Sequence, residues 1–400
     1  MGLLSLNISE PICRCSAKFD SADTERVNAG KISDNSLIPY IGLRSAAVIF
    51  FAGILLASLT LHPGRLEARK SETESKEKDA AKRKSNLDAL QKKILYANST
   101  ERRNGIAKIK DLNESEKGPF VELLKKLAIE DLDYFVRESS VRTLGEMDRK
   151  DAEDVLIKAL DDKKSDVQRS AIHSLSEIES KKPLPVFEMI KKQDLSEYST
   201  LNTAAIRLLG DMKYKEASSF FNEKMKDPKI NPENKRAILL FYGSSGAVEM
   251  KDTLLDTARD EGEQLTMREY AVNSLGRLND KSAIPELKNI YGSIRSLNSK
   301  QERLKFSRLK LQIITALIRL GDDSVVPEII AAAKDDDSNI RLRAIRQIGE
   351  MKLVSAKSLL EFKAEHDESA QVKKAAKESL EIINGKKIKK KIDDELETKQ

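Results

Sequence analysis

The chain has 400 residues, of which 40% are hydrophobic and 34% are charged, and its formal net charge is +6. The chain contains three histidines, two cysteines and no tryptophan. This composition excludes a small fold held together by several disulfides, and it provides few soft ligands for a metal centre. Lysine and arginine number 71 against 65 acidic residues, and the two signs are interspersed. The basic excess therefore gives little support to binding of a polyanion.

Residues 1–36 are predicted to be a poorly structured extension. Both cysteines, Cys13 and Cys15, lie in it, and with no other soft ligand nearby they are not expected to bind metal. The extension is longer than the charged region that opens an ordinary signal peptide. One explanation is a translation start further along the chain, near Leu37 or Leu43.

An apolar segment follows from Leu37 to Leu61, with Arg44 as its single charged residue. Residues 37–68 are interpreted as a signal peptide or a transmembrane anchor, and both readings put the segment into a membrane at least transiently. A small residue after the apolar run, Ala68, favours cleavage and export to the periplasm or cell envelope. Basic residues are denser after the run than before it, so a retained inner-membrane anchor, the alternative, would keep the rest of the chain in the cytoplasm.

Two charged segments flank the remaining sequence. Residues 69–86 carry mixed charges without an apolar stripe and are predicted to be a charged linker, as a solvated tether or a frayed helix. Residues 384–400 begin with Asn384 and Gly385, which end the last predicted helix, and form a charged C-terminal tail.

Between these segments one sequence pattern recurs, and it is clearest from Val136 to Met147. Apolar or small residues fall at positions 136, 140, 141, 144 and 147, which is the stripe of an amphipathic helix with one buried face. Aligning the copies on a Leu-Gly pair gives anchors at Lys110, Gly145, Ser176, Gly210, Gly243, Gly276, Gly321, Gly349 and Glu381. Successive anchors differ by 35, 31, 34, 33, 33, 45, 28 and 32 residues, a period typical of a solenoid.

A second helical stretch lies between successive anchors, so each period is predicted to be a helical hairpin. Asp166, Ser338 and Ser139 are expected to supply capping oxygens near the starts of the inner helices. The interval that ends at Gly321 is about a dozen residues too long, which predicts an extended helix or a protruding loop around Gly292 to Arg303. No alternation typical of strands competes with this all-α reading.

The repeated phrases "VRxxxVxxLGxM" from Val136 and "IRxxAIxxIGxM" from Ile340 resemble the HEAT repeat family, in particular the bacterial HEAT-like repeats named from phycobilisome lyases. The resemblance covers about residues 87–383. It implies an all-α fold, a right-handed α-α superhelix of about nine helical hairpins. It also implies that arginines of the inner helices form ladders with acidic residues of neighbouring repeats, with Asp133, Glu146, Asp211 and Asp280 as candidates.

Motifs for catalysis are not found in this sequence. It has no Gly-x-Ser-x-Gly, no phosphate-binding loop and no Cys-x-x-Cys. Deoxyhypusine hydroxylase, a HEAT-type enzyme, holds two irons with His-Glu pairs, but here His173 precedes Ser174 and His366 precedes Asp367. No metal, cofactor or catalytic residue is therefore predicted, and the chain is expected not to be an enzyme.

The predicted function is that of a scaffold in the cell envelope, whose concave face, lined by the second helix of each hairpin, binds a protein or peptide. Its predicted contact residues are exposed positions on the inner helices: Arg142, His173, Arg207, Tyr242, Asn273 and Arg346. Tyr242 replaces a core leucine of the repeat, so packing between repeats is the alternative for that side chain. Nucleic acid is not expected as a partner, because few aromatic residues accompany the basic ones.

Two alternatives to this function remain open. One is a lyase-like or chaperone-like activity on a protein or tetrapyrrole, which the family resemblance suggests. The other is an adaptor that is anchored in the membrane and faces the cytoplasm. The oligomeric state is not indicated by the sequence.

Overall fold

A computed structural model describes residues 63–386, which are helices joined by short loops, without a β-strand among them. The predicted N-terminal extension, the apolar segment to Leu61 and nearly all of the C-terminal tail lie outside this range. The chain divides into two compact units, residues 1–79 and 80–400. The all-α prediction is confirmed.

Helix α2 (Pro63–Tyr96) provides the described part of the first unit, residues 63–79, and continues into the second. The segment predicted as a charged linker, residues 69–86, lies within it. Side chains from Glu72 to Asn86 are all exposed, so this stretch is a helix without a buried face. Over residues 63–386, no helix is both long enough and apolar enough to cross a lipid bilayer.

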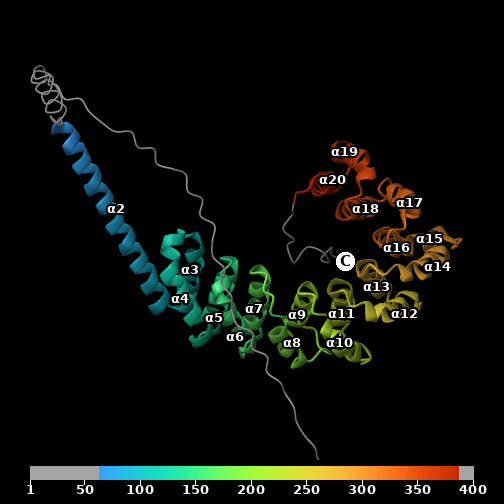
Figure 1. The fold of residues 1–400 in the computed structure, drawn as a ribbon, viewed down its shortest axis with the longest axis horizontal. Coiled ribbons are helices and arrows are strands. Elements are labelled where there is room, and N and C mark those ends of the chain that lie inside the picture. The colour runs from blue at the N-terminus through green and yellow to red at the C-terminus, as the bar shows by residue number, and fades with distance from the viewer. Residues whose placement is uncertain (1–62, 387–400) are drawn as a thin grey trace, which may run out of the picture. The chain divides into compact units, whose positions relative to one another are not determined.

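The second unit is built from helical hairpins in two layers (Figure 1). The layer that we call the inner helices contains α3 (Ser99–Ala107), α5 (Tyr134–Glu146), α7 (Ser165–Glu177), α9 (Thr200–Asp211), α11 (Pro232–Ser245), α13 (Leu265–Leu278), α16 (Ser307–Arg319), α18 (Ser338–Glu350) and α20 (Ala370–Ile383). The outer helices are α4 (Glu114–Glu130), α6 (Glu153–Lys158), α8 (Pro183–Lys191), α10 (Ser218–Met225), α12 (Lys251–Arg259), α14 (Ile284–Arg295), α17 (Val326–Ala332) and α19 (Lys357–His366).

The apolar stripe of each inner helix forms the core of its repeat. Val136, Val141 and Leu144 on α5 are completely buried, as the periodicity predicts. Burying one such side chain contributes roughly 1.5 to 3 kcal/mol. Because α5 packs mainly on α4 and on its neighbours α3 and α7, stability arises from adjacent repeats rather than from one central core.

The capping residues differ from those predicted. The side chain of Asp133 caps α5 by accepting from the N–H of Phe135, and Asp337 caps α18 by accepting from the N–H of Asn339. Ser139 lies inside α5, and Ser338 is the first residue of α18. The aspartates take the role because each sits one position before its helix, where the side chain reaches the free N–H groups of the first turn.

Glycine lets successive inner helices approach each other closely. A Cβ atom on Gly243 of α11 would lie 2.6 Å from the Cα of Ser274 on α13. The Ser274 hydroxyl donates a hydrogen bond of 2.7 Å to the main-chain oxygen of Leu239, back on α11. The same glycine and serine pair joins α5 to α7 and α18 to α20, so the repeated Leu-Gly pair is explained by close helix packing.

The ends of the inner helices correct one anchor of the sequence alignment. A residue with positive φ lies three positions after six of the other anchors, at Asp148, Glu179, Lys213, Gly246, Asn279 and Lys352. Gly321 has φ +88° and belongs to this set, so the anchor of its repeat is Ile318. The prediction of Gly321 as an anchor was therefore wrong, and the intervals on either side are 42 and 31 residues instead of 45 and 28.

The long interval between the anchors Gly276 and Ile318 contains an extended outer helix and an additional short helix. Helix α14 continues to Arg295, and a short additional helix, α15 (Lys300–Lys305), precedes α16. At the next junction, between α16 and α18, Ile318 and Gln347 stand where other repeats have glycine and serine. These two helices contact each other much less extensively than the other neighbouring inner helices do, because larger side chains prevent a close approach.

Candidate functional site

Five of the predicted contact residues occupy the same position in their repeats. Each lies three residues before its anchor, on α5, α7, α9, α13 and α18. Arg142 and Arg346 are exposed, and His173, Arg207 and Asn273 are half-buried. We call these five residues the inner row. Helices that stack in register place equivalent positions side by side, so the inner row follows one surface of the repeats.

The sixth predicted residue, Tyr242, is not on this surface. It is fully buried, with its ring 5.8 Å from that of Phe241, because it occupies the core position that leucine fills in α5 and α9. Burial raises the pKa of its phenol. The prediction that Tyr242 contacts a partner was wrong, and its packing between repeats, the alternative, is what the structure shows.

Arginines at the starts of several inner helices hold the hairpins together. Arg137 donates to both carboxylate oxygens of Asp162, at 2.6 and 2.9 Å, and to the main-chain oxygen of Asp131 at 2.8 Å. Arg341 pairs in the same way with Asp367, at 3.0 Å for both bonds. Arg268, at the equivalent position, donates to the main-chain oxygen of Ala258. These repeated arginines are engaged within the fold and are not a nucleic-acid-binding stripe.

A polar ladder crosses three inner helices at Asn273. Its side-chain oxygen accepts from Nε of Arg277 at 3.1 Å and from Nη1 of Arg319 on α16 at 3.2 Å. Arg319 also donates to Glu350 on α18 at 2.9 Å. Asn273 is therefore a ladder residue, and only the part of its side chain left exposed is available to a partner.

The acidic residues proposed for such ladders have divided roles. Glu146 accepts from Lys110 of the preceding repeat at 3.2 Å and lies 3.9 Å from Arg142. Asp133 instead caps α5, and Asp280 caps the turn that begins at Lys281. Aspartates in the short loops are close enough to cap a helix start, whereas the longer Glu146 side chain reaches across to the next helix.

A second group of charged residues lies beside the inner row and was missed by the sequence reasoning. Glu269 on α13 has a side chain that is only 8% exposed, and its carboxylate lies 3.5 Å from the guanidinium of Arg308 on α16. Burial raises the pKa of Glu269, against the opposing effect of Arg308 and of Arg343 on α18. Together with Arg346 of the inner row, these residues form what we call the arginine cluster: Glu269, Arg308, Arg343 and Arg346.

Arg343 is the unusual member of the cluster. It is half-buried, and burial lowers the pKa of its guanidinium, as do the positive charges of Arg308 and Arg346. Within residues 63–386 its guanidinium makes no hydrogen bond and no ion pair. The signal in the sequence was positional, since Glu269 and Arg343 lie one helical turn before the inner row, but the alignment could not show that α13 and α18 bring them within electrostatic range.

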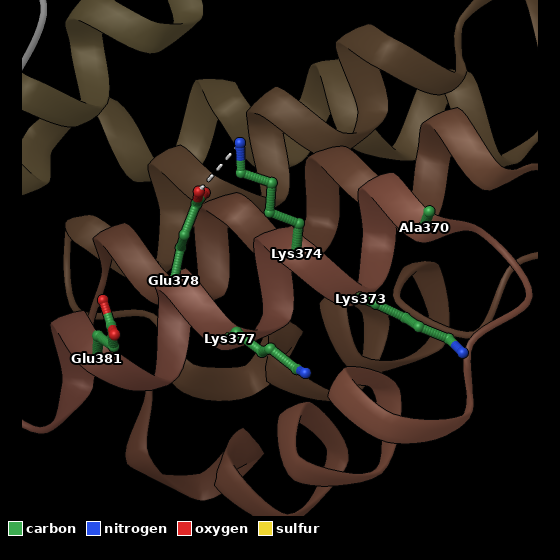
Figure 2. A pocket seen from close by; sticks show the side chains of 6 residues that line it. All are labelled: Ala370, Lys373, Lys374, Lys377, Glu378 and Glu381. Carbon is green, nitrogen blue, oxygen red and sulfur yellow. Dashed lines mark ion pairs between the residues drawn. The ribbon is translucent and has the colours of Figure 1, made fainter.

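A hollow of about 330 Å³ lies on α20 and is lined by residues of that helix alone (Figure 2). Three lysines, Lys373, Lys374 and Lys377, project from it, and Glu378 pairs with Lys374 at 3.9 Å. Such a polar surface is typical of the terminal repeat of a solenoid, which must face water where another repeat would otherwise pack.

Metal ligands do not gather in the described part of the chain. No three side chains of His, Cys, Asp or Glu between residues 63 and 386 come together in an arrangement that could hold an ion. The structure therefore adds no metal-ligating residue to those considered from the sequence.

Comparison with protein families places HEAT repeats on three stretches of the chain. The model for HEAT repeats matches residues 121–200 and 302–381. The model for the PBS lyase HEAT-like repeat matches residues 267–292, which include most of α13 and Glu269. A comparison with curated protein sequences finds no match.

The solved structures that resemble this chain are distant. The complex of CpcE and CpcF of phycocyanin lyase from Nostoc sp. PCC7120 is 14% identical, with a TM-score of 0.36, over 66% of this chain and 94% of that one. Human deoxyhypusine hydroxylase is also 14% identical, with a TM-score of 0.25, over 76% and 97%. The Escherichia coli protein YibA is 17% identical, with a TM-score of 0.33, over 69% and 95%.

At these identities and TM-scores the solved structures carry no argument about activity. The family matches, in contrast, coincide with the hairpins in which glycine, serine and arginine form the repeated packing contacts. These stretches of the chain are HEAT repeats, as the resemblance of the sequence predicts.

Proposed function

We propose that the chain is a non-enzymatic scaffold that binds a protein or peptide along the inner row. The observation that supports this proposal is that the polar side chains of the inner helices have two different roles. Arg137 and Arg341 are engaged in contacts between hairpins, while the inner row repeats a partly or fully exposed polar position over five helices. A surface repeated in this way suits an extended partner, because each repeat adds a modest contact.

The contacts along the inner row are weak enough to be exchanged for a partner. Arg142 lies 3.6 Å from Glu138 and 3.9 Å from Glu146 of its own helix, with 53% of its side chain exposed. Surface ion pairs of this kind stabilise a protein by roughly 0 to 1 kcal/mol. Releasing Arg142 towards an acidic group of a partner would therefore cost little.

The test is site-specific photo-crosslinking in the native cell. A photoreactive phenylalanine derivative replaces Arg142 or Arg207 in the inner row, and Glu188 on α8 or Glu223 on α10 in matched controls that are exposed on the outer helices. One crosslinked protein shared by both inner positions and missing at the outer ones is the expected result. Equal crosslinking from both layers, or none from the inner row, would contradict the proposal.

We also propose that this binding takes place in the cell envelope. The support is the apolar segment from Leu37 to Leu61, which lies outside the described residues. Fractionation and mass spectrometry of the first peptide test this location. A periplasmic product that starts near Arg69 is expected, and an intact apolar segment in the membrane fraction would instead favour the anchored adaptor.

A lyase-like activity is the second candidate, and one observation favours it. The stretch that matches the PBS lyase HEAT-like repeat contains Glu269, a buried carboxyl with a raised pKa beside an arginine. A carboxyl whose pKa is raised by burial beside a charged group is a candidate for proton transfer in a functional site. An absorbance titration with a free tetrapyrrole tests this candidate, and an unchanged spectrum in the presence of the protein would exclude it.

A further inference from the structure

The arginine cluster is electrostatically incomplete. It sets three guanidinium groups, those of Arg308, Arg343 and Arg346, against the single carboxylate of Glu269. Arg308 lies 3.5 Å from that carboxylate, whereas Arg343 and Arg346 have no ion-pair partner among residues 63–386. Arg341, which also lies on α18, is by contrast paired with Asp367.

This incompleteness has an energetic consequence. A partly buried guanidinium loses hydration and is stabilised only when an anion replaces the lost water. Arg343 is half-buried and makes no hydrogen bond or ion pair among residues 63–386. In keeping with this, burial and the charges of Arg308 and Arg346 lower its pKa, against the opposing effect of Glu269. A group of this kind is more typical of a binding site than of a structural contact.

The packing of the repeats explains why the cluster stays open. Ile318 and Gln347 replace glycine and serine between α16 and α18, and these helices contact each other less extensively than the other pairs do. Arg308 lies on α16 and Arg343 on α18, the two helices that form this junction. The side chain of Arg308 is 48% exposed, so a ligand from solvent can reach the cluster.

We propose that the arginine cluster binds a carboxylate of an acidic peptide segment of the partner, where α13, α16 and α18 adjoin the inner row. The planar fork of arginine matches a carboxylate in a bidentate geometry. This inference rests on the proposed function, because it names the chemistry of the partner that the inner row binds.

The buried Glu269 makes a carboxylate a better ligand than a phosphate. When ionised it repels an anion at the cluster, and the repulsion is greater for a phosphate with nearly two negative charges than for a carboxylate with one. Neighbouring basic residues are neutralised, since Arg319 pairs with Glu350 and Arg236 with Glu233. The cluster is thus an isolated basic spot and not part of a track along which a nucleic-acid backbone could bind.

The experiment uses the full-length chain in a mild detergent and a short fluorescein-labelled peptide rich in glutamate. Fluorescence anisotropy measures its affinity for the unmodified chain, for Arg343→Gln and for the matched control Arg259→Gln, an exposed arginine of the outer helix α12. We expect Arg343→Gln to weaken binding by about 10- to 100-fold, as for the loss of a charged hydrogen bond. Arg259→Gln should change it less than about twofold.

A second measurement separates a binding role from a structural one. Arg343→Met removes the uncompensated charge and should raise the midpoint of thermal unfolding while it abolishes peptide binding. The control Arg137→Met breaks the pair with Asp162 and should lower the midpoint while peptide binding persists. A lower midpoint for Arg343→Met, with unchanged binding, would overturn the proposal.

Competition identifies the class of ligand. A glutamine version of the peptide, inorganic phosphate and oligothymidylate should each fail to displace the acidic peptide. Displacement by oligothymidylate at a lower concentration than by unlabelled acidic peptide would overturn the proposal in favour of nucleic acid. Failure of the unmodified chain to bind the acidic peptide would also overturn it, whereas crosslinking from positions 142 and 207 would still test the proposed function by itself.

Discussion

Gly349 on α18 faces Ser379 on α20 so closely that a Cβ atom on the glycine would lie 2.6 Å from the Cβ of the serine. The Ser379 hydroxyl then donates a hydrogen bond of 3.0 Å to the main-chain oxygen of Ile345 on the glycine's own helix. The absence of a side chain at Gly349 thus allows two repeats to approach closely, and the Ser379 hydroxyl links them by a hydrogen bond. Since the same pair recurs between α5 and α7 and between α11 and α13, it is a general packing device of this solenoid.

Gly349→Ala should therefore lower the free energy of unfolding by about 1 to 3 kcal/mol, the usual cost of overpacking a tight contact. Urea denaturation measures the loss, and hydrogen exchange should show it in α18 and α20 before the distant repeats. The matched control is Gly292→Ala on α14, where a Cβ atom would meet nothing within 4 Å. There alanine should stabilise the helix by up to about 1 kcal/mol, so equal losses from both variants would argue against the packing role of Gly349.

Tyr242→Phe should leave the stability unchanged or increase it. The Tyr242 hydroxyl is buried and makes no hydrogen bond within the described residues, so its removal eliminates a desolvated polar group without breaking an interaction. Tyr242→Ala, which removes the ring as well, should cost about 3 to 5 kcal/mol, the range for buried aromatic residues. Thermal unfolding of both variants checks the pair, and a marked destabilisation by phenylalanine would reveal a partner for the hydroxyl.

Asp367 should make the last repeats sensitive to acid. Burial by itself would raise its pKa, but hydrogen bonds from Arg341, Lys363 and the N–H of Ser369 hold the pKa well below its usual value. A depressed pKa contributes stability that is present above the unfolded-state pKa of about 4 and is lost as the pH falls further.

The variant Asp367→Asn should thus be less stable than the unmodified chain by about 3 to 5 kcal/mol at pH 7, because Arg341 is left without its buried partner. The difference should shrink as the pH is lowered below about 4. Urea denaturation across this pH range is the measurement, with the exposed Asp323→Asn as control. If the difference in the free energy of unfolding does not depend on pH, the Asp367 side chain stabilises the fold through its packing and not through its charge.

Glu269 should have the opposite pH dependence. Its pKa is raised, chiefly by burial, so its contribution to stability is fully present below the unfolded-state pKa of about 4.3 and is lost as the pH rises through the folded-state value. Glu269→Gln stays neutral, and this variant should gain stability relative to the unmodified chain between pH 4 and pH 8. The exposed Glu249→Gln serves as control, and a loss of stability at pH 8 would mean that the pair with Arg308 outweighs the cost of burial.

Much of the architecture could be predicted from the sequence because each repeat is a local structure. The stripe from Val136 to Met147 identified a helix with one buried face, and the period identified hairpins that pack on their neighbours. The five positions of the inner row also followed from that register, since equivalent positions in stacked helices share a surface. The error at Gly321 arose because Leu-Gly at 320–321 resembles the anchor phrase, whereas its glycine ends the helix with a positive φ.

The sequence by itself determined the helices, the repeat and the inner row, because these depend on spacing along one chain. Only the tertiary structure decided that Tyr242 is buried, that Asn273 belongs to a ladder, and that Glu269 and Arg343 lie within electrostatic range across an intervening helix. Charge compensation is a property of groups brought together in space, so a sequence that intersperses both signs cannot show which arginine is left without a partner. In the described part of this chain Arg343, which is half-buried on α18, is one such arginine.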